Sequence, residues 1–212
     1  MSLSEKAIKK LYYQENLSAA DVGKKLGVSS WAVLSFMKRK NLRRRSFSEA
    51  NAVVFNSKSL SFSAKKKLSF FEKELKIAGI MLYWAEGSKS LNGFSSVDFC
   101  NSDSRMIRLF LEFLRKICGV DEERLRVHLY CYADQDIAEI KKYWANLTKI
   151  PLSQFVKPYI RKDFSIEKKR EMKYGLAHIR YSDKKLLLQI NKWIEEMVNN
   201  RVGTEVDKPD SL

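Results

Sequence analysis

The sequence predicts an α+β protein built from a small all-α N-terminal domain and a larger domain with helices on one face of an antiparallel sheet. Apolar residues recur every three or four positions in several segments, which is typical of amphipathic helices. Other segments alternate apolar and polar residues, which is typical of half-buried strands. With only 8 glycines and 3 prolines among 212 residues, the composition also favours helices.

The composition narrows the class of protein. Hydrophobic residues make up 45% of the chain, enough to bury a sizeable core. No apolar run approaches the roughly 18 residues of a membrane span, and no signal peptide is visible, so we expect a cytoplasmic protein without a membrane partner. Three widely spaced cysteines, Cys100, Cys118 and Cys131, do not form a CxxC pair, and their odd number argues against a disulfide framework.

The positive charge is concentrated near the N-terminus. The net charge is +15, and residues 1–70 hold 15 Lys and Arg against 4 Asp and Glu, a net charge of +11. A local basic excess favours an anionic polymer as partner, whereas a role in solubility alone predicts an even spread.

The first 45 residues contain three predicted helices. Apolar residues at helical spacing mark the first, around residues 7–12. Ser18 and Asp21 form a capping box that begins the second, Gly27 follows as a turn residue, and a serine at position 29 or 30 caps a third helix over 31–40. This order resembles the helix-turn-helix units of recombinases and sigma-type regulators, which bind double-stranded DNA.

That resemblance assigns DNA contacts to the third helix and to the arginines after it. The alternative is a helical hairpin used only for packing. The expected contacts with the major groove or its phosphates are Ser29, Ser30, Trp31, Ser35 and Lys38. The expected arm on the DNA backbone or in the minor groove is Arg43, Arg44 and Arg45.

A basic linker is predicted over residues 46–69, which are rich in Ser, Lys and Asn and include Lys65, Lys66 and Lys67. A short helix is possible within it, over 49–55. The larger domain is expected over 70–200, and a polar tail over 201–212.

Four helices are predicted in the larger domain. Ile77, Ile80, Met81 and Trp84 form a helical stripe in the first. The second begins at Ser102 or Asp103 and ends at Gly119, with four residues inward: Met106, Leu109, Phe110 and Phe113. The third covers about 134–147. The fourth covers about 183–197, with three residues inward: Leu187, Ile190 and Ile194.

Four strands are predicted. The first covers 95–100, and three later ones alternate apolar residues with basic or polar ones. The apolar positions are Leu125, Val127 and Leu129; Val156, Pro158 and Ile160; and Ala177, Ile179 and Tyr181. The other faces would line a DNA-binding surface of Arg124, Arg126, His128, Lys157, Tyr159, Arg161, His178 and Arg180. Ordinary solvated strand faces are the alternative.

The segment Gly79–Gly87, GIMLYWAEG, and the elements after it resemble the LAGLIDADG homing endonucleases over roughly 70–197. The resemblance implies a saddle-shaped antiparallel sheet with helices on one face. It also implies a homodimer, since the chain has one motif and the family pairs two motif helices. Here Met81 and Trp84 stand where that family usually has smaller residues.

The resemblance places Glu86 on the family's metal-binding acid, with Mg²⁺ as the expected cofactor and Lys89 as a second candidate catalytic residue. The alternative makes Glu86 a helix-end carboxylate paired with a lysine. No glycine-rich phosphate loop, GxSxG or HExxH motif is present, so no small-molecule substrate is expected.

Three functions follow from these patterns. The first is a sequence-specific, Mg²⁺-dependent DNA endonuclease. The second is a DNA-binding transcription regulator that retains the fold and does not cleave. The third is an RNA-binding splicing accessory protein that uses the same sheet surface.

Overall fold

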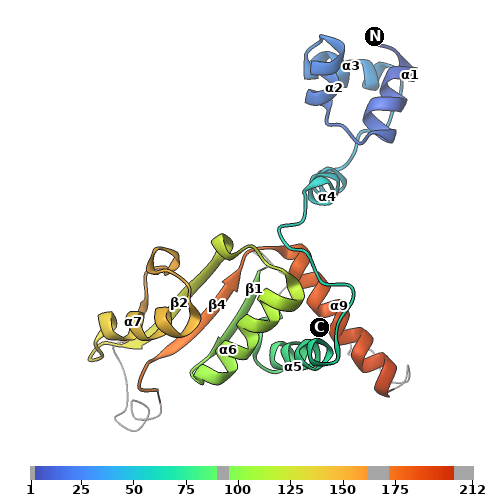
Figure 1. Cartoon of the computed structure of the whole chain (residues 1–212). Helices are drawn as coiled ribbons and strands as arrows, with labels where there is room; N and C mark the ends of the chain where they lie inside the picture. The colour runs from blue at the N-terminus through green and yellow to red at the C-terminus, as the bar shows by residue number, and fades with distance from the viewer. Residues whose placement is uncertain (1–2, 90–95, 162–171, 203–212) are drawn as a thin grey trace. The chain divides into compact units, whose positions relative to one another are not determined.

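The computed structural model describes residues 3–89, 96–161 and 172–202. The chain divides into two compact units, Met1–Ser59 and Leu60–Leu212. The first contains only helices, and the second combines helices with one sheet, so the α+β class is confirmed (Figure 1).

The first unit contains the three predicted helices and one more. The first helix is α1, Glu5–Ile8, which continues as a π-helical turn over Lys9–Gln14. Next come α2, Ala19–Leu26, and α3, Ser30–Arg39. The last is α4, Phe47–Ser57, which lies where the sequence allows a short helix and buries no residue.

Serine caps and one left-handed glycine determine how α2 and α3 meet. The side chain of Ser18 accepts a hydrogen bond from the backbone of Asp21, and Ser29 does the same for Ala32. Gly27 ends α2 with a φ of 70°, a conformation that favours glycine. The two helices close over a small core of Ile8, Leu11, Tyr12, Val22, Val33 and Met37.

Residues 46–69 are divided between the two units. Helix α4 belongs to the first. The stretch after it belongs to the second, where Phe62 is buried in the core and Ser63 donates a backbone hydrogen bond to Gly119, 3.0 Å.

The second unit contains a four-stranded sheet in the order β1-β4-β2-β3. The strands are β1, Val97–Asn101; β2, Leu125–Tyr132; β3, Tyr159–Arg161; and β4, Leu176–Tyr181. Strand β4 is antiparallel to both neighbours, whereas β3 is parallel to β2. The sheet is therefore mixed, and the expectation of an antiparallel sheet is wrong for β3.

The reason lies in the segment between β2 and β3. It contains α7, Ile137–Thr148, followed by a 3₁₀ turn at Leu152–Gln154. A helix of this length carries the chain back to the starting end of β2, so the next strand runs in the same direction. The sequence predicted that helix, but the parallel pairing was not inferred from it.

Three further helices pack with the sheet. Helix α5 covers Phe70–Glu86. Helix α6, Ser104–Glu112, continues as a π-helical turn over Phe113–Cys118 and ends at Gly119, as predicted. Gly119 has the left-handed conformation. Helix α9 covers Lys184–Val202. Figure 1 shows α6 crossing the face of β1 and β4, with α5 beside α9.

Most predicted inward residues are buried. Val127, Leu129, Ile179 and Tyr181 have at most 1% exposure, which confirms the alternation in β2 and β4. Phe110, Phe113, Leu187, Ile190 and Ile194 are buried as well.

Some predicted inward residues are exposed instead. Leu109 is 37% exposed because α6 turns Ile107, Phe110 and Leu111 toward the sheet. Val156 and Ile160 are also exposed. Val156 lies before β3, outside any strand, and Ile160 lies on β3, an edge strand of only three residues.

The three cysteines are free thiols, of which Cys118 and Cys131 are buried and Cys100 is half-buried. In the part of the chain that the structure describes, no helix has both the length and the apolar character required to cross a membrane.

Candidate nucleic-acid interface

Helix α3 exposes the face on which DNA contacts were predicted. Trp31, Ser35 and Lys38 recur at helical spacing, opposite the buried residues Val33 and Met37. Trp31 is 75% exposed, an unusual position for so large an apolar side chain. Ser29 caps the helix through its hydroxyl, and Ser30 is exposed beside it.

A shallow groove runs along this face of α3. Its volume is about 600 Å³, and its lining residues are Trp31, Leu34, Ser35, Lys38, Asn41, Leu42, Arg43 and Arg44. The structure thus brings most of the predicted contacts of the first unit to one surface.

The three consecutive arginines have different roles. Arg43 pairs with Glu49, 2.6 Å, and Arg44 is exposed. Arg45 donates hydrogen bonds to the backbone oxygens of Tyr12 and Leu17, both 2.6 Å, and of Asn16, 3.2 Å. Its guanidinium also lies 4.0 Å above the Tyr12 ring. Arg45 therefore stabilises the first unit and is not available to a DNA-binding arm.

The face of the sheet opposite the helices carries the other predicted contacts in rows. Asp98, Arg180 and Arg126 lie opposite one another across β1, β4 and β2. One step along, Cys100, His178 and His128 form the next row. This outer face is half-buried at its centre, since His128, Tyr130, His178 and Arg180 have intermediate exposure.

Most arginines of the outer face are bonded within the protein. Arg180 donates to Asp98, 2.6 Å, and Arg126 donates to the backbone oxygens of Glu123, 2.6 Å, and Leu125, 2.8 Å. Arg124 lies before β2, in a 3₁₀ turn over Glu122–Arg124, and donates to the backbone of Ser182. Its predicted place on a strand is wrong, because Asp121 caps that turn and β2 begins at Leu125.

The pKa values of Asp98 and His128 on this face are shifted in ways that bear on its charge. Burial acts to raise the pKa of Asp98, but hydrogen bonds and charge from His178 and Arg180 outweigh it and lower the pKa. Burial, together with the nearby charges of Arg180 and His178, lowers the pKa of His128. The Nδ1 atom of His128 is buried without a hydrogen-bond partner among the described residues.

An aromatic cluster occupies the β2–β3 side of the outer face. Tyr130 lies between His178, with ring centroids 4.6 Å apart, and Tyr159, 5.1 Å. The ring centroid of His128 is 5.1 Å from that of Tyr130. Tyr130 was not among the predicted contacts, although the same alternation that selected His128 also selects it.

The remaining predicted contacts lie at this same side of the sheet. Lys157 is exposed two residues before β3, and Tyr159 and Arg161 are exposed on β3. The three are thus grouped near the aromatic cluster.

Glu86 is the last residue of α5 and is exposed. The helix end is fixed to β1, since the backbone of Ser88 donates to Asp98, 2.9 Å, and the hydroxyl of Tyr83 donates to the backbone of Ser88, 2.6 Å. Gly87 permits this contact, because a Cβ there would lie 2.4 Å from the Tyr83 ring. Among the described residues, the Glu86 carboxylate has neither a hydrogen bond nor an ion pair. Lys89 is exposed as well, and the two side chains are not paired, which disfavours the alternative of a helix-end carboxylate held by that lysine.

The described residues of one chain do not form a protein cage for a metal. They contain no group of three or more His, Cys, Asp or Glu side chains able to hold one. Mg²⁺ often binds through one or two carboxylates together with substrate phosphates and water, and an unpaired Glu86 is compatible with that mode.

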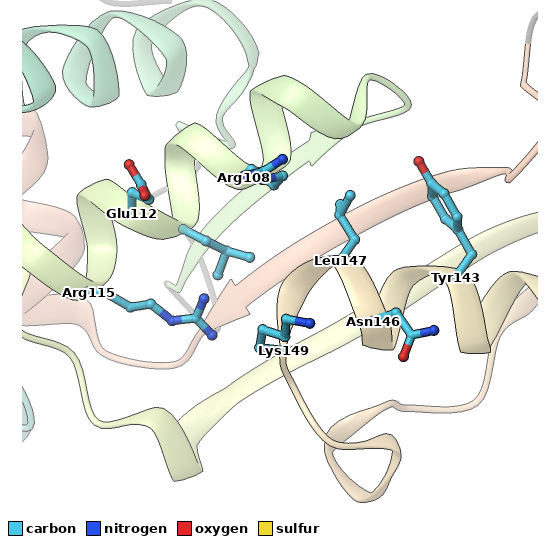
Figure 2. A pocket seen from close by; sticks show the side chains of 8 residues that line it. Arg108, Glu112, Arg115, Tyr143, Asn146, Leu147 and Lys149 are labelled. Atoms are coloured by element: carbon cyan, nitrogen blue, oxygen red, sulfur yellow. The ribbon is translucent and has the colours of Figure 1, made fainter.

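A further groove lies on the helical side of the sheet, between α6 and α7. Figure 2 shows Arg108, Glu112 and Arg115 on one wall and Tyr143, Asn146 and Lys149 on the other. Arg115 is bound to Glu122 and to the backbone oxygen of Thr148, 2.9 Å. This groove is separate from the outer face and contains no predicted contact.

Comparison of the chain with known protein families, with curated proteins and with solved structures finds no match.

Proposed function

We propose that this chain binds double-stranded DNA as a homodimer and cleaves it in a metal-dependent reaction that requires Glu86. The observation that carries the proposal is the exposed face of α3, where Trp31, Ser35 and Lys38 line one groove with Arg43 and Arg44. The turn before α3 and its capped N-terminus suit a helix-turn-helix unit, in which the second helix enters the major groove.

Charge supports a duplex as the partner. The first unit holds 12 Lys and Arg against 4 Asp and Glu, and the groove beside α3 is lined by cations without a lining carboxylate. Cations at that surface neutralise phosphates and make the affinity depend on salt. We expect each of Lys38 and Arg44, when replaced by alanine, to reduce the salt slope by about one.

An exposed apolar stripe on α5 supports the homodimer. Ile77, Met81 and Trp84 are each 41–45% exposed and lie on one side of the helix, while Ile80 and Tyr83 are buried on the other. A second copy offers the same stripe, so two α5 helices can cover each other about a twofold axis. This is the pairing that the resemblance to LAGLIDADG endonucleases implies.

In such a dimer Glu86 of each copy would stand at the end of its α5. A divalent cation bound there neutralises the phosphate charge and activates water. The contacts of Ser88 and Tyr83 fix the end of α5, and with it the backbone at Glu86, relative to the sheet. This supports the proposal, because attack on a phosphodiester requires a positioned metal ligand.

A second candidate is a DNA-binding regulator that does not cleave. The observation that favours it is the orientation of Gly79, which is buried against Phe113 of the same chain, whereas the stripe facing outward is bulky. Side chains as large as Met81 and Trp84 hold two helices further apart than small residues do, and two Glu86 carboxylates are then further apart as well.

Selection from a random duplex library distinguishes these candidates. The wild-type chain and Glu86→Gln are each incubated with the library and Mg²⁺, and bound and cleaved molecules are sequenced separately. We expect cleaved sites with the wild type and bound but uncleaved sites with the variant. Specific binding without cleavage by the wild type favours the regulator, and cleavage that persists in the variant excludes Glu86 as the metal ligand.

A further inference from the structure

We propose that the outer face of the sheet contains a pocket for one unpaired nucleobase of a DNA strand. The pocket lies where β2, β3 and the start of β4 meet. Its volume is about 350 Å³, and its lining includes Tyr130, Tyr132, Tyr159, Arg161, Met172 and Leu176. This inference rests on the proposed DNA binding. It narrows the DNA that the chain would bind to a duplex that continues into an unpaired strand.

The size and lining suit a flat aromatic ligand. The volume is at the lower end of the roughly 300–1,000 Å³ of small-molecule sites, as expected for a single base. Three tyrosines, Cys131, Met172 and Leu176 line it together with one cation, Arg161. Base stacking on such rings depends little on sequence, because every base has a π-face.

The arrangement of the rings favours stacking. Tyr159 is 55% exposed on a strand at the sheet edge, so one side of its ring borders solvent. Tyr130, beside it, is itself supported by His178 and His128. A base entering the pocket would extend a row of rings that is already ordered, and few side chains need to be immobilised.

The same surface is less suited to a paired duplex. Bases within a duplex offer only their edges in the grooves, and charged groups that read edges must be free to do so. Here Arg180 is held by Asp98, and Arg126 is held by backbone oxygens. Lys157 is exposed at the same side of the sheet and adds a positive charge for the phosphate of an entering nucleotide.

Binding to three labelled DNAs tests the proposal. The DNAs are a blunt duplex of the selected site, the same duplex with a twelve-nucleotide dT arm, and the dT strand alone. A fourth ligand carries an RNA arm of uridines, which separates a general unpaired base from a DNA strand. The proteins are the full chain, Tyr159→Ala and Tyr159→Phe, each checked for an unchanged thermal unfolding midpoint.

We expect the arm to strengthen binding by the wild type, and Tyr159→Ala to weaken binding of the armed duplex roughly 5- to 150-fold, the range for one stacked base. Tyr159→Phe retains the ring and should bind like the wild type. Tyr159→Ala should weaken binding of the blunt duplex much less than binding of the armed duplex, because the α3 surface is unchanged. A 2-aminopurine placed in the arm should lose fluorescence on binding to the wild type but not to Tyr159→Ala.

Three outcomes with the Tyr159 variants overturn the proposal: no effect of Tyr159→Ala on the armed duplex, an equal loss for armed and blunt duplex, or a loss in Tyr159→Phe as large as in Tyr159→Ala. An equal loss would place the tyrosine on the duplex that both ligands share, and a loss in Tyr159→Phe would show that the hydroxyl and not the stacked ring supplies the binding. Tight binding of the dT strand without binding of the blunt duplex would refute the proposed duplex recognition and leave the pocket supported. An arm of RNA bound better than DNA would overturn the assignment to a DNA strand.

Discussion

Replacement of Gly79 by alanine should destabilise the second unit, although alanine is the better helix former. Gly79 is buried in α5, where an added Cβ would lie 2.1 Å from Cγ and 2.5 Å from Cβ of Phe113. Carbon atoms in contact are normally about 3.5–4.0 Å apart, so the helix or the ring must move by more than 1 Å.

Two opposing free energies decide the result. Alanine in place of glycine inside a helix stabilises it by about 1 kcal/mol. Overpacking a close-packed core costs about 1–3 kcal/mol, and the Phe113 side chain has no free space because it is fully buried beside Phe110 and Trp193. We therefore expect a net loss of roughly 0–2 kcal/mol, or several degrees in the unfolding midpoint of a domain of this size.

The assay is urea unfolding followed by tryptophan fluorescence in a Trp31→Phe background. The other tryptophans, Trp84, Trp144 and Trp193, all belong to the second unit, so the signal then reports that unit alone. Phe113→Leu, alone and combined with Gly79→Ala, is the matched control: beside the smaller side chain, Gly79→Ala should cost less than it does beside Phe113. A Gly79→Ala variant more stable than its parent would refute the packing argument.

Other predictions follow from the remaining contacts. Trp84→Ala should weaken self-association up to about 1,000-fold, because the 41% of the tryptophan surface that is exposed would be buried twice in each dimer. Leu152→Ala changes a side chain exposed elsewhere and should leave self-association unchanged, and sedimentation equilibrium measures both variants. Because the pKa of His128 is lowered from 6.5, the folded protein binds its proton less well than the unfolded chain, and stability should fall as the pH drops below 6.5; His128→Gln should flatten that loss in urea titrations at several pH values. Arg45→Lys should destabilise the first unit by roughly 1–3 kcal/mol and Arg44→Lys hardly at all, measured by hydrogen exchange of residues 5–26.

The sequence predicted the helices and the buried strands well because their periodicity reflects burial directly. Val127 and Ile179 alternate with polar neighbours and are buried, and Gly119 ends its helix as expected. Short edge strands carry no such signal. Tyr159–Arg161 is parallel to β2 because α7 returns the chain, and the alternation around it corresponds to no buried face.

Hydrogen bonds and ion pairs between side chains and residues far away in the sequence were harder to predict than helices and strands. Arg45 follows Arg43 and Arg44 in an apparently uniform basic run, yet it bonds to backbone oxygens 28–33 residues away. The Asp98 carboxylate is hydrogen-bonded to Arg180 and His178, which lie on a strand about 80 residues later. Such pairs depend on which strands become neighbours, and local periodicity does not contain that information.

The two edges of the sheet also affect how copies of the chain can associate. The backbone of β1 is met by the residues after α5 through the Ser88 contact and the bridge between Gly87 and Phe99, and β3 on the other side has only three residues. Covered or very short edge strands resist pairing with another chain, which is how natural sheets avoid aggregation. Growth of the sheet from one molecule into the next is thus disfavoured, and close association is left to side-chain surfaces such as the stripe on α5.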